Sequence, residues 1–319
     1  MRSVKKAMII SASRRTDIPA FYAEWFINRL KQGSFLVKNP YNGNGISRIT
    51  FTRESIDCIV FWTKNAEPML SKLKTIDAMG YPYYFQFTIT PYDRDIEKKL
   101  PPKSAIVDTF KRLSATIGRE RVVWRYDPII INNELSVEYH MDKFGSLCKR
   151  LSGYTGQCVF SFIELYPKIR RKMQSVAESP AAIADKYRIG QGFAKIAAEY
   201  NLALATCCEI TDFSSYNIEK AACIDQKRIE SILGCRLKTQ KDNNQRLACN
   251  CIKSVDIGAY DCCPHGCIYC YATTHDHRVY ANRQQHDRDA AIITGSLDNE
   301  KAVVTKRAES LKQLQLPLF

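Results

Sequence analysis

Regular alternation of strand-like and helix-like stretches constrains the fold of this chain more than any other feature of its sequence. Six short runs are rich in apolar, β-branched and aromatic residues, and polar residues follow each of them. Runs of this length and composition are typical of buried strands. The six runs are Met8–Ser13, Cys58–Lys64, Tyr83–Thr90, Arg121–Asp127, Cys158–Glu164 and Leu202–Cys207.

Helical periodicity fills the segments between these runs. The first predicted helix has a good start signal in Asp17 and Pro19, and glycines end several of the others. The helices are expected over residues 18–32, 67–79, 104–117, 136–151 and 181–200. Because strands and helices alternate, the strands should be parallel. We therefore predict an α/β fold, a partial TIM-type (β/α)6 barrel whose function lies at the carboxyl ends of its strands.

The sequence changes character after residue 210. We expect a partial barrel over residues 1–210 and a cysteine-rich segment over 211–280 that closes the mouth of the barrel. A polar tail should follow over residues 281–319, where Ala290–Ile293 is a short apolar patch.

Composition limits the class of protein. The chain has 319 residues, of which 45% are hydrophobic and 25% charged, as in globular proteins. Its formal net charge of +14 favours polyanionic partners. No apolar run approaches the roughly 18 residues of a membrane helix, and the first residues do not fit a secretory signal. We therefore expect a cytoplasmic protein without a membrane partner.

The thirteen cysteines do not suit a disulfide scaffold, because their number is odd and no export signal is evident. Six of them fall within residues 249–270, and clustering of this kind indicates metal. The others lie mostly in apolar surroundings and are expected to be buried free thiols. These seven are Cys58, Cys148, Cys158, Cys207, Cys208, Cys223 and Cys235.

Cys263, Cys267 and Cys270 form a C-x3-C-x2-C pattern. Three thiolates at this spacing can hold three irons of a [4Fe–4S] cube and leave the fourth iron open, whereas four thiolates close the usual cluster. A four-thiolate zinc site from Cys249, Cys251, Cys267 and Cys270 is the alternative, although it leaves Cys263 unused. Cys249 and Cys251 can also bind a second metal, supply a fourth ligand or be structural.

The string from Tyr260 to Ala272 resembles the cluster loop of radical S-adenosylmethionine (SAM) enzymes, and the spore photoproduct lyase branch in particular. The resemblance implies that Cys263, Cys267 and Cys270 ligate a [4Fe–4S] cluster whose open iron binds SAM. It also implies that an electron from a reductant protein then yields a 5′-deoxyadenosyl radical. By the same resemblance, the backbone of Tyr269 lies against the adenine of SAM.

In radical SAM enzymes this loop follows the first strand of the barrel, whereas here it follows the sixth predicted strand. The usual glycine-rich SAM-binding motif after the second strand is not recognisable. We therefore expect a circularly permuted, radical-SAM-like arrangement. Residues 7–275 also resemble a bacterial and archaeal family, domain of unknown function eighteen forty-eight. Its matching stretches are Ser11–Pro19, Phe61–Asn65, Val123–Pro128 and Ser254–Gly258.

Polar side chains at the ends of predicted strands should line the pocket of such a barrel. Because a charge within an apolar strand is costly unless paired, Arg125 should bind a carboxylate or phosphate, or pair internally with Asp17 or Asp127. With Tyr269, the candidate cofactor-binding residues are Thr63, Asn65 and Gln86. The candidate catalytic residues are Arg14, Asp17, Lys64, Arg125, Asp127 and Glu209.

The last residues, Gln313–Phe319, resemble the peptide with which bacterial replication and repair proteins dock on the DNA sliding clamp. Apolar side chains on a polar terminus suit such a partner. Together with the net charge of +14 and the lyase-like loop, this peptide predicts an enzyme of DNA repair or modification. The alternatives are a radical SAM enzyme acting on a small metabolite or peptide, and a non-enzymatic iron–sulfur or zinc protein.

Overall fold

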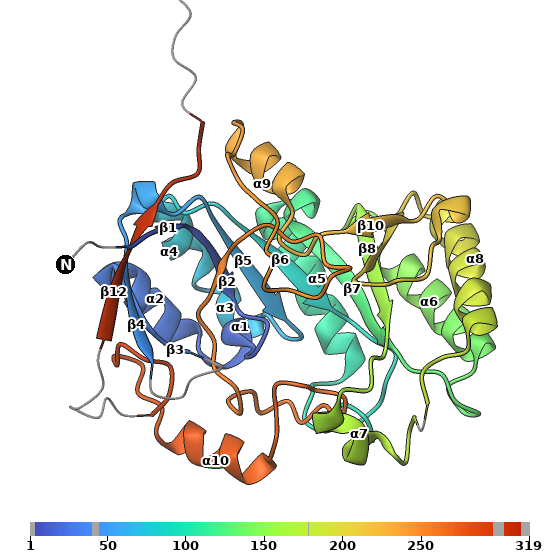
Figure 1. Cartoon of the computed structure of the whole chain (residues 1–319). Helices are drawn as coiled ribbons and strands as arrows, with labels where there is room; N and C mark the ends of the chain where they lie inside the picture. The colour runs from blue at the N-terminus through green and yellow to red at the C-terminus, as the bar shows by residue number, and fades with distance from the viewer. Residues whose placement is uncertain (1–3, 40–44, 178, 296–302, 314–319) are drawn as a thin grey trace, which may run out of the picture.

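An eight-stranded parallel sheet in the order β10-β9-β8-β7-β6-β5-β2-β11 forms the centre of the molecule (Figure 1). The computed structural model describes residues 4–39, 45–177, 179–295 and 303–313. The predicted α/β fold with parallel strands is confirmed. The strands are β2 (Ile9–Ala12), β5 (Cys58–Thr63), β6 (Tyr83–Thr88), β7 (Val122–Ile129), β8 (Gln157–Phe162), β9 (Ala203–Cys207), β10 (Glu219–Ala221) and β11 (Val255–Asp256).

Helices connect most of these strands. Asp17 accepts a hydrogen bond from the amide of Ala20 at the start of α1, and Gly33, with φ 65°, ends α2. Because successive right-handed crossovers add strands in one direction, β2 to β10 stand in chain order. The helices are α1 (Ile18–Phe21), α2 (Ala23–Gln32), α3 (Glu67–Leu70), α4 (Leu73–Ala78), α5 (Lys103–Ile117), α6 (Val137–Leu151), α7 (Pro167–Met173), α8 (Ile183–Glu199), α9 (Gln226–Leu233) and α10 (Asp276–Gln284).

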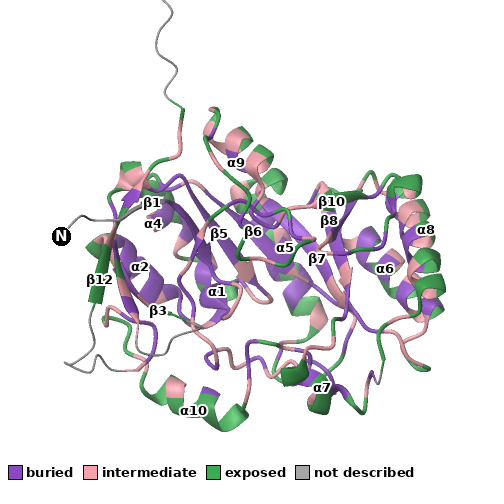
Figure 2. Ribbon diagram, in the orientation of Figure 1, coloured by how far each residue is buried: buried purple, intermediate pink, exposed green. Residues whose placement is uncertain are grey.

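Alternation of side chains gives the sheet two different faces. Phe61, Phe85 and Trp124 point to the helical side, where they share one buried core with Phe110 of α5 and Phe144 of α6. The central strands are buried, whereas α8 and α10 expose much of their surface (Figure 2). The helices therefore provide the main core, and the opposite face of the sheet is left for another segment.

That segment comes from the cysteine-rich part of the chain. Val60 and Tyr84 on the second face pack against Cys223, Cys251 and Ile252. The same face carries polar groups of the central strands, so it can hold a site as well as a core.

The structure adds to the predicted architecture in two places. The sheet has two strands beyond the six predicted, β10 and β11, which are three and two residues long and too short to give a periodic pattern. They form the opposite edges of the sheet, so the described strands do not close into a barrel.

The predicted polar tail over 281–319 contains an ordered strand. A second sheet has the order β1-β12-β4-β3, in which β12 lies between two partners. Most side chains of β12 are exposed, which is why its sequence does not show a buried strand. The strands of this sheet are β1 (Val4–Ala7), β3 (Ser34–Lys38), β4 (Ile46–Thr50) and β12 (Val303–Glu309).

Two further predictions concern partners. Of the predicted clamp-binding peptide, residues 314–319 lie outside the described residues, and the amide of Gln313 donates to the Arg236 carbonyl over 3.0 Å. Of the helices in the described ranges, none is both long and apolar enough to cross a bilayer.

Candidate functional site

A cavity of about 490 Å³ lies where the parallel strands end. Residues at or just beyond the ends of β2, β5, β7, β8 and β9 form part of its wall, and the loop that follows β11 forms another part. Ligands of open α/β sheets bind at this edge. The volume is within the range of small-molecule sites.

The predicted cluster ligands meet in this cavity. Cys263, Cys267 and Cys270 line its wall, and Cys263 interacts with both of the others. Burial raises the pKa of Cys263 well above its usual range and that of Cys267 to about 12. Cys263 and Cys267 are therefore protonated at neutral pH, and a metal that binds them would have to displace their protons.

The spacing of the ligands matters for the kind of metal. Throughout the described ranges, no three His, Cys, Asp or Glu side chains are placed to hold a single metal ion. A cluster has a different requirement, since each thiolate binds its own iron.

Backbone contacts fix the cluster loop, residues 263–270, against the segment that follows β6. Glu97 and Cys267 form an antiparallel β-bridge. The amide of Lys99 donates to the His265 carbonyl and that of Ile268 to the Ile96 carbonyl, each over 3.0 Å. The loop is therefore held by main chain as well as by its side chains.

Glu97 is a central residue that sequence reasoning missed. It is 1% exposed, and it accepts hydrogen bonds from Tyr269, Lys103, Thr90 and Lys64, the last two over 2.7 Å. Burial alone would raise the pKa of Glu97, but the two ammonium groups outweigh it and lower the pKa to about 2. The residue lies in an irregular connection, where periodicity gives no signal.

Asp17 holds the loop after β2, the end of β5 and the cluster loop together. One carboxylate oxygen accepts from the Ala20 amide at 3.0 Å and the Thr63 hydroxyl at 2.8 Å. The other accepts from the Lys64 amide and from His265 Nε2, both at 2.7 Å. Asp17 lines the cavity, and each of its carboxylate oxygens accepts two hydrogen bonds, which hold these three segments in place.

Arg125 forms the internal ion pair that was one of its two predicted roles. Its Nη2 donates to Asp127 over 2.6 Å, and Ser161 donates to the same carboxylate. Burial opposes ionisation of Asp127, but Arg125 outweighs it and lowers the Asp127 pKa. Nη1 of Arg125 reaches the Cys223 thiol at 3.0 Å.

Arg14 lies between the cavity and a second hollow. Its amide donates to Asp256 over 2.9 Å, and its guanidinium stacks on Trp62 with 5.2 Å between the guanidinium carbon and the ring centroid. Arg14 Nη2 is buried and has no hydrogen-bond partner among the described residues. The same holds, within those ranges, for Nδ1 of His265.

The remaining predicted residues are divided between the cavity and its surroundings. Thr63 and Tyr269 line the cavity. Gln86 is buried behind the wall and donates to the Cys223 carbonyl over 3.0 Å. Asn65 accepts from the Glu67 amide at the start of α3, and Glu209 pairs with Lys186 of α8 at 2.9 Å.

Three cysteines that were expected to be buried free thiols line the same cavity. Cys207 and Cys208 lie at the end of β9, and Cys223 follows β10. They meet Cys249 and Cys251, which also line the wall. The position of Cys207 and Cys208 at a strand end was the available signal, whereas Cys223 lies outside the predicted strands. All thirteen cysteines of the chain are free thiols.

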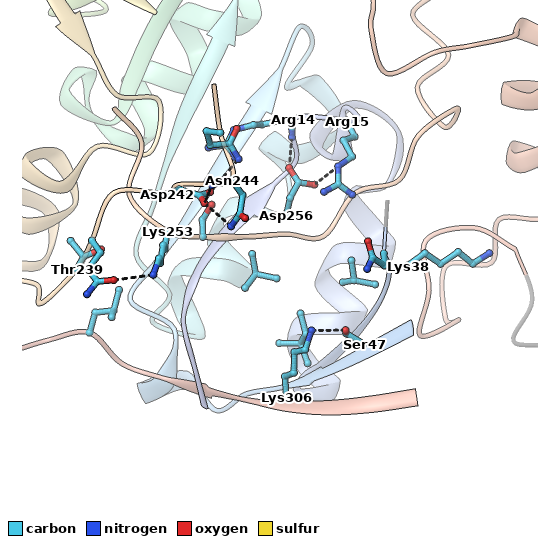
Figure 3. Close-up of a pocket in the computed structure, with 18 of the residues that line it drawn as sticks. Arg14, Arg15, Lys38, Ser47, Thr239, Asp242, Asn244, Lys253, Asp256 and Lys306 are labelled. Carbon is cyan, nitrogen blue, oxygen red and sulfur yellow. Dashed lines mark hydrogen bonds and ion pairs between the residues drawn. The ribbon is translucent and has the colours of Figure 1, made fainter. Parts of the chain in front are cut away.

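A larger hollow of about 1040 Å³ adjoins the cavity and shares Arg14, Arg15, Asn244, Gln245 and Tyr271 with it. In Figure 3, Asp256 receives contacts from Arg14 and Arg15, and Lys253 and Lys306 lie on other parts of the wall. We call this hollow the basic groove after its cations, which are Arg14, Arg15, Lys38, Lys238, Lys253 and Lys306.

Comparisons with known proteins give one match. The model of the family "Domain of unknown function (DUF1848)" matches residues 9–272, which include the large sheet, the cluster loop and the five further cavity cysteines. No curated protein and no solved structure gives a significant match. The chain therefore belongs to the DUF1848 family.

Proposed function

We propose that this protein is an iron–sulfur enzyme of the radical SAM type that acts on DNA. The observation that carries the proposal is the convergence of Cys263, Cys267 and Cys270 with Tyr269 in one cavity at the carboxyl ends of parallel strands. Three thiols without a fourth partner in their own loop suit a cluster with an open iron. The buried Nδ1 of His265, which has no hydrogen-bond partner among the described residues, also suits a cavity that receives a polar cofactor.

The order of strands supports the permuted, radical-SAM-like arrangement. β11 pairs with β2 at the edge of the sheet, and the cluster loop follows β11 after a short connection. In radical SAM enzymes the strand before the cluster loop is the first of the barrel. β11 would take that place here, although it is encoded last among the eight strands.

The residues of the chain have defined tasks in this proposal. When bound, the reduced cluster and SAM supply a 5′-deoxyadenosyl radical for hydrogen abstraction. Glu97 and Asp17 orient Tyr269 and His265 in the cluster loop. Lys64, 5.4 Å from the Tyr269 ring centroid, adds positive charge beside the thiols.

DNA is the proposed substrate because of the basic groove. Six cations line this groove beside the cavity. The lining also has two carboxylates, and both already accept hydrogen bonds from other residues. Phosphates bind such surfaces and could bring a nucleotide to the mouth of the cavity. The net charge of +14 acts in the same direction. A cytoplasmic location, where thiols stay reduced, is part of the proposal.

Cleavage of SAM tests this function. Anaerobically purified protein, reduced with dithionite, should form 5′-deoxyadenosine, and Cys263→Ala, Cys267→Ala and Cys270→Ala should each reduce the rate to background. Cys148→Ala, on the buried face of α6, should retain the wild-type rate. Absence of 5′-deoxyadenosine from iron-loaded wild-type protein would reject the proposal.

A further inference from the structure

Five thiols outside the cluster loop share the cavity wall. They come from three separate segments, at the end of β9, after β10 and in the loop before β11. Packing alone does not require so many thiols on one wall, because any small apolar residue fills such space. We call them the five-thiol group: Cys207, Cys208, Cys223, Cys249 and Cys251.

The five-thiol group is continuous. The Sγ atoms of Cys207 and Cys223 are 3.1 Å apart. Cys223 also interacts with Cys251, Cys251 with Cys249, and Cys249 with Cys208. Every member therefore has at least one other thiol beside it, although the segments are far apart in the sequence.

Positive charge surrounds these thiols. Arg125 is 4% exposed, and its Nη1 donates to Cys223 over 3.0 Å. Arg14 interacts electrostatically with Cys251 and Cys223. The buried Arg14 Nη2 finds no acceptor in the described part of the chain, so a hydrogen bond is left for a bound group.

We propose that the five-thiol group binds a second iron–sulfur cluster, separate from the one assigned to Cys263, Cys267 and Cys270. Thiolates are the ligands that iron–sulfur clusters prefer, and four of them complete the usual coordination. The group has five thiols, one more than the four that a closed cluster requires. Arg14 and Arg125 would offset the negative charge of a thiolate-ligated cluster and donate hydrogen bonds to its sulfur atoms.

This inference extends the proposed function but does not depend on it, because the two sets of ligands share no residue. The second cluster would have a closed coordination, which suits electron storage or transfer rather than SAM binding. A zinc ion is the other occupant that thiolates favour.

Iron, sulfide and zinc contents of three variants test the second cluster. All proteins are full-length and are reconstituted anaerobically. The first variant replaces Cys263, Cys267 and Cys270 with alanine. The second carries Cys223→Ser and Cys251→Ser, which nearly conserve volume. The control carries Cys148→Ala and Cys158→Ala, two buried core thiols away from the cavity wall.

The first variant should keep about half of the wild-type iron and sulfide, and the second variant should keep the other half. The control should keep all of both. An iron-free first variant, or zinc in place of iron and sulfide, would overturn the second cluster. If the second variant does not fold, the iron and sulfide contents of the first variant still test the second cluster.

The same data separate this inference from the proposed function. If iron remains in the first variant at the wild-type level, the cluster loop binds none. The proposed function then fails while the second cluster stands. If only the second variant keeps all of the wild-type iron, the five-thiol group binds none. The second cluster then fails while the proposed function stands.

Discussion

Glu97 links four side chains around the cluster loop. It compensates the charges of Lys64 and Lys103, and it fixes the hydroxyl of Tyr269. Buried ion pairs of this kind are retained where a geometry must be specified. Glu97 therefore belongs to the machinery that holds the cluster loop.

Glu97→Gln should lower the free energy of unfolding by about 3–5 kcal/mol, because two lysines then face each other in a buried site without an anion. Chemical denaturation at neutral pH measures the change. Glu134→Gln, at an exposed position, should change it by less than about 0.5 kcal/mol. Equal stability of the two variants would show that Glu97 does not hold this network.

His140 should make stability depend on pH. It is fully buried, its Nδ1 meets the Tyr126 hydroxyl at 2.9 Å, and its Nε2 meets the Ile130 carbonyl at 2.8 Å. Burial lowers its pKa from 6.5 to about 4. Between these two values the unfolded chain binds a proton and the folded chain does not, so stability falls as the pH falls.

From pH 7 to pH 5, His140 should contribute a loss of about 2 kcal/mol in the free energy of unfolding. His140→Phe should be less stable at every pH, since it leaves two buried polar groups without a hydrogen-bond partner. Between pH 7 and pH 5, however, its free energy of unfolding should fall by about 2 kcal/mol less than that of the wild type. Denaturant titrations at both pH values make the comparison. Parallel pH profiles for the two proteins would contradict the assignment.

At the scale of elements, β11 is the shortest strand of the large sheet, and its side chains hold it in place. Asp256 accepts from Ser11 at 2.8 Å, Ser13 at 2.6 Å, the Arg14 amide at 2.9 Å and the Gly258 amide at 3.0 Å. These contacts attach the strand before the cluster loop to the loop that follows β2.

Asp256→Asn should destabilise the protein by about 2–3 kcal/mol. The side-chain NH2 of asparagine would be a hydrogen-bond donor facing the four groups that donate to the Asp256 carboxylate. It should also lower the iron content, since the cluster loop follows this strand. Denaturation and iron analysis measure both effects. Asp142→Asn on the exposed side of α6 is the control and should leave both unchanged. Wild-type values for Asp256→Asn would argue against the role of β11.

The elements also show what the sequence could and could not predict. Periodicity predicted six of the strands and five helical stretches. The spacing of the cysteines in the cluster loop predicted that these residues lie together, and they line one cavity. β10 and β11 were missed because strands of two or three residues have no period. β12 was missed because its side chains are mostly exposed.

Long-range pairing explains the remaining misses at the site. The prediction that Cys223 is a buried free thiol is confirmed. Its contact with Arg125 could not be predicted, because only the folding of the cysteine-rich segment onto the sheet brings the two together. Glu97 could not be found for a similar reason, since its partners come from the residue after β5, from α5 and from the cluster loop.

At the scale of the molecule, the basic groove adjoins the cavity and shares wall residues with it, and the proposed function makes this groove the DNA-binding surface. The double variant Lys238→Glu, Lys253→Glu should bind a fluorescent single-stranded DNA at least about tenfold more weakly, with a shallower salt dependence. Fluorescence anisotropy over a salt series measures this.

Lys149→Glu, Lys195→Glu provides the matched control. Both lysines are exposed on α6 and α8, on the helical side, and the net charge changes equally. Equal weakening of the two double variants would mean that total charge, and not the groove, determines binding.

Diffraction at the iron absorption edge from anaerobically grown crystals tests the central claim most directly. We predict anomalous density for a four-iron cluster bonded to Sγ of Cys263, Cys267 and Cys270, with one iron that has no cysteine ligand and faces the cavity. Density for a lone zinc ion, or no metal density beside these three sulfur atoms, would contradict the account.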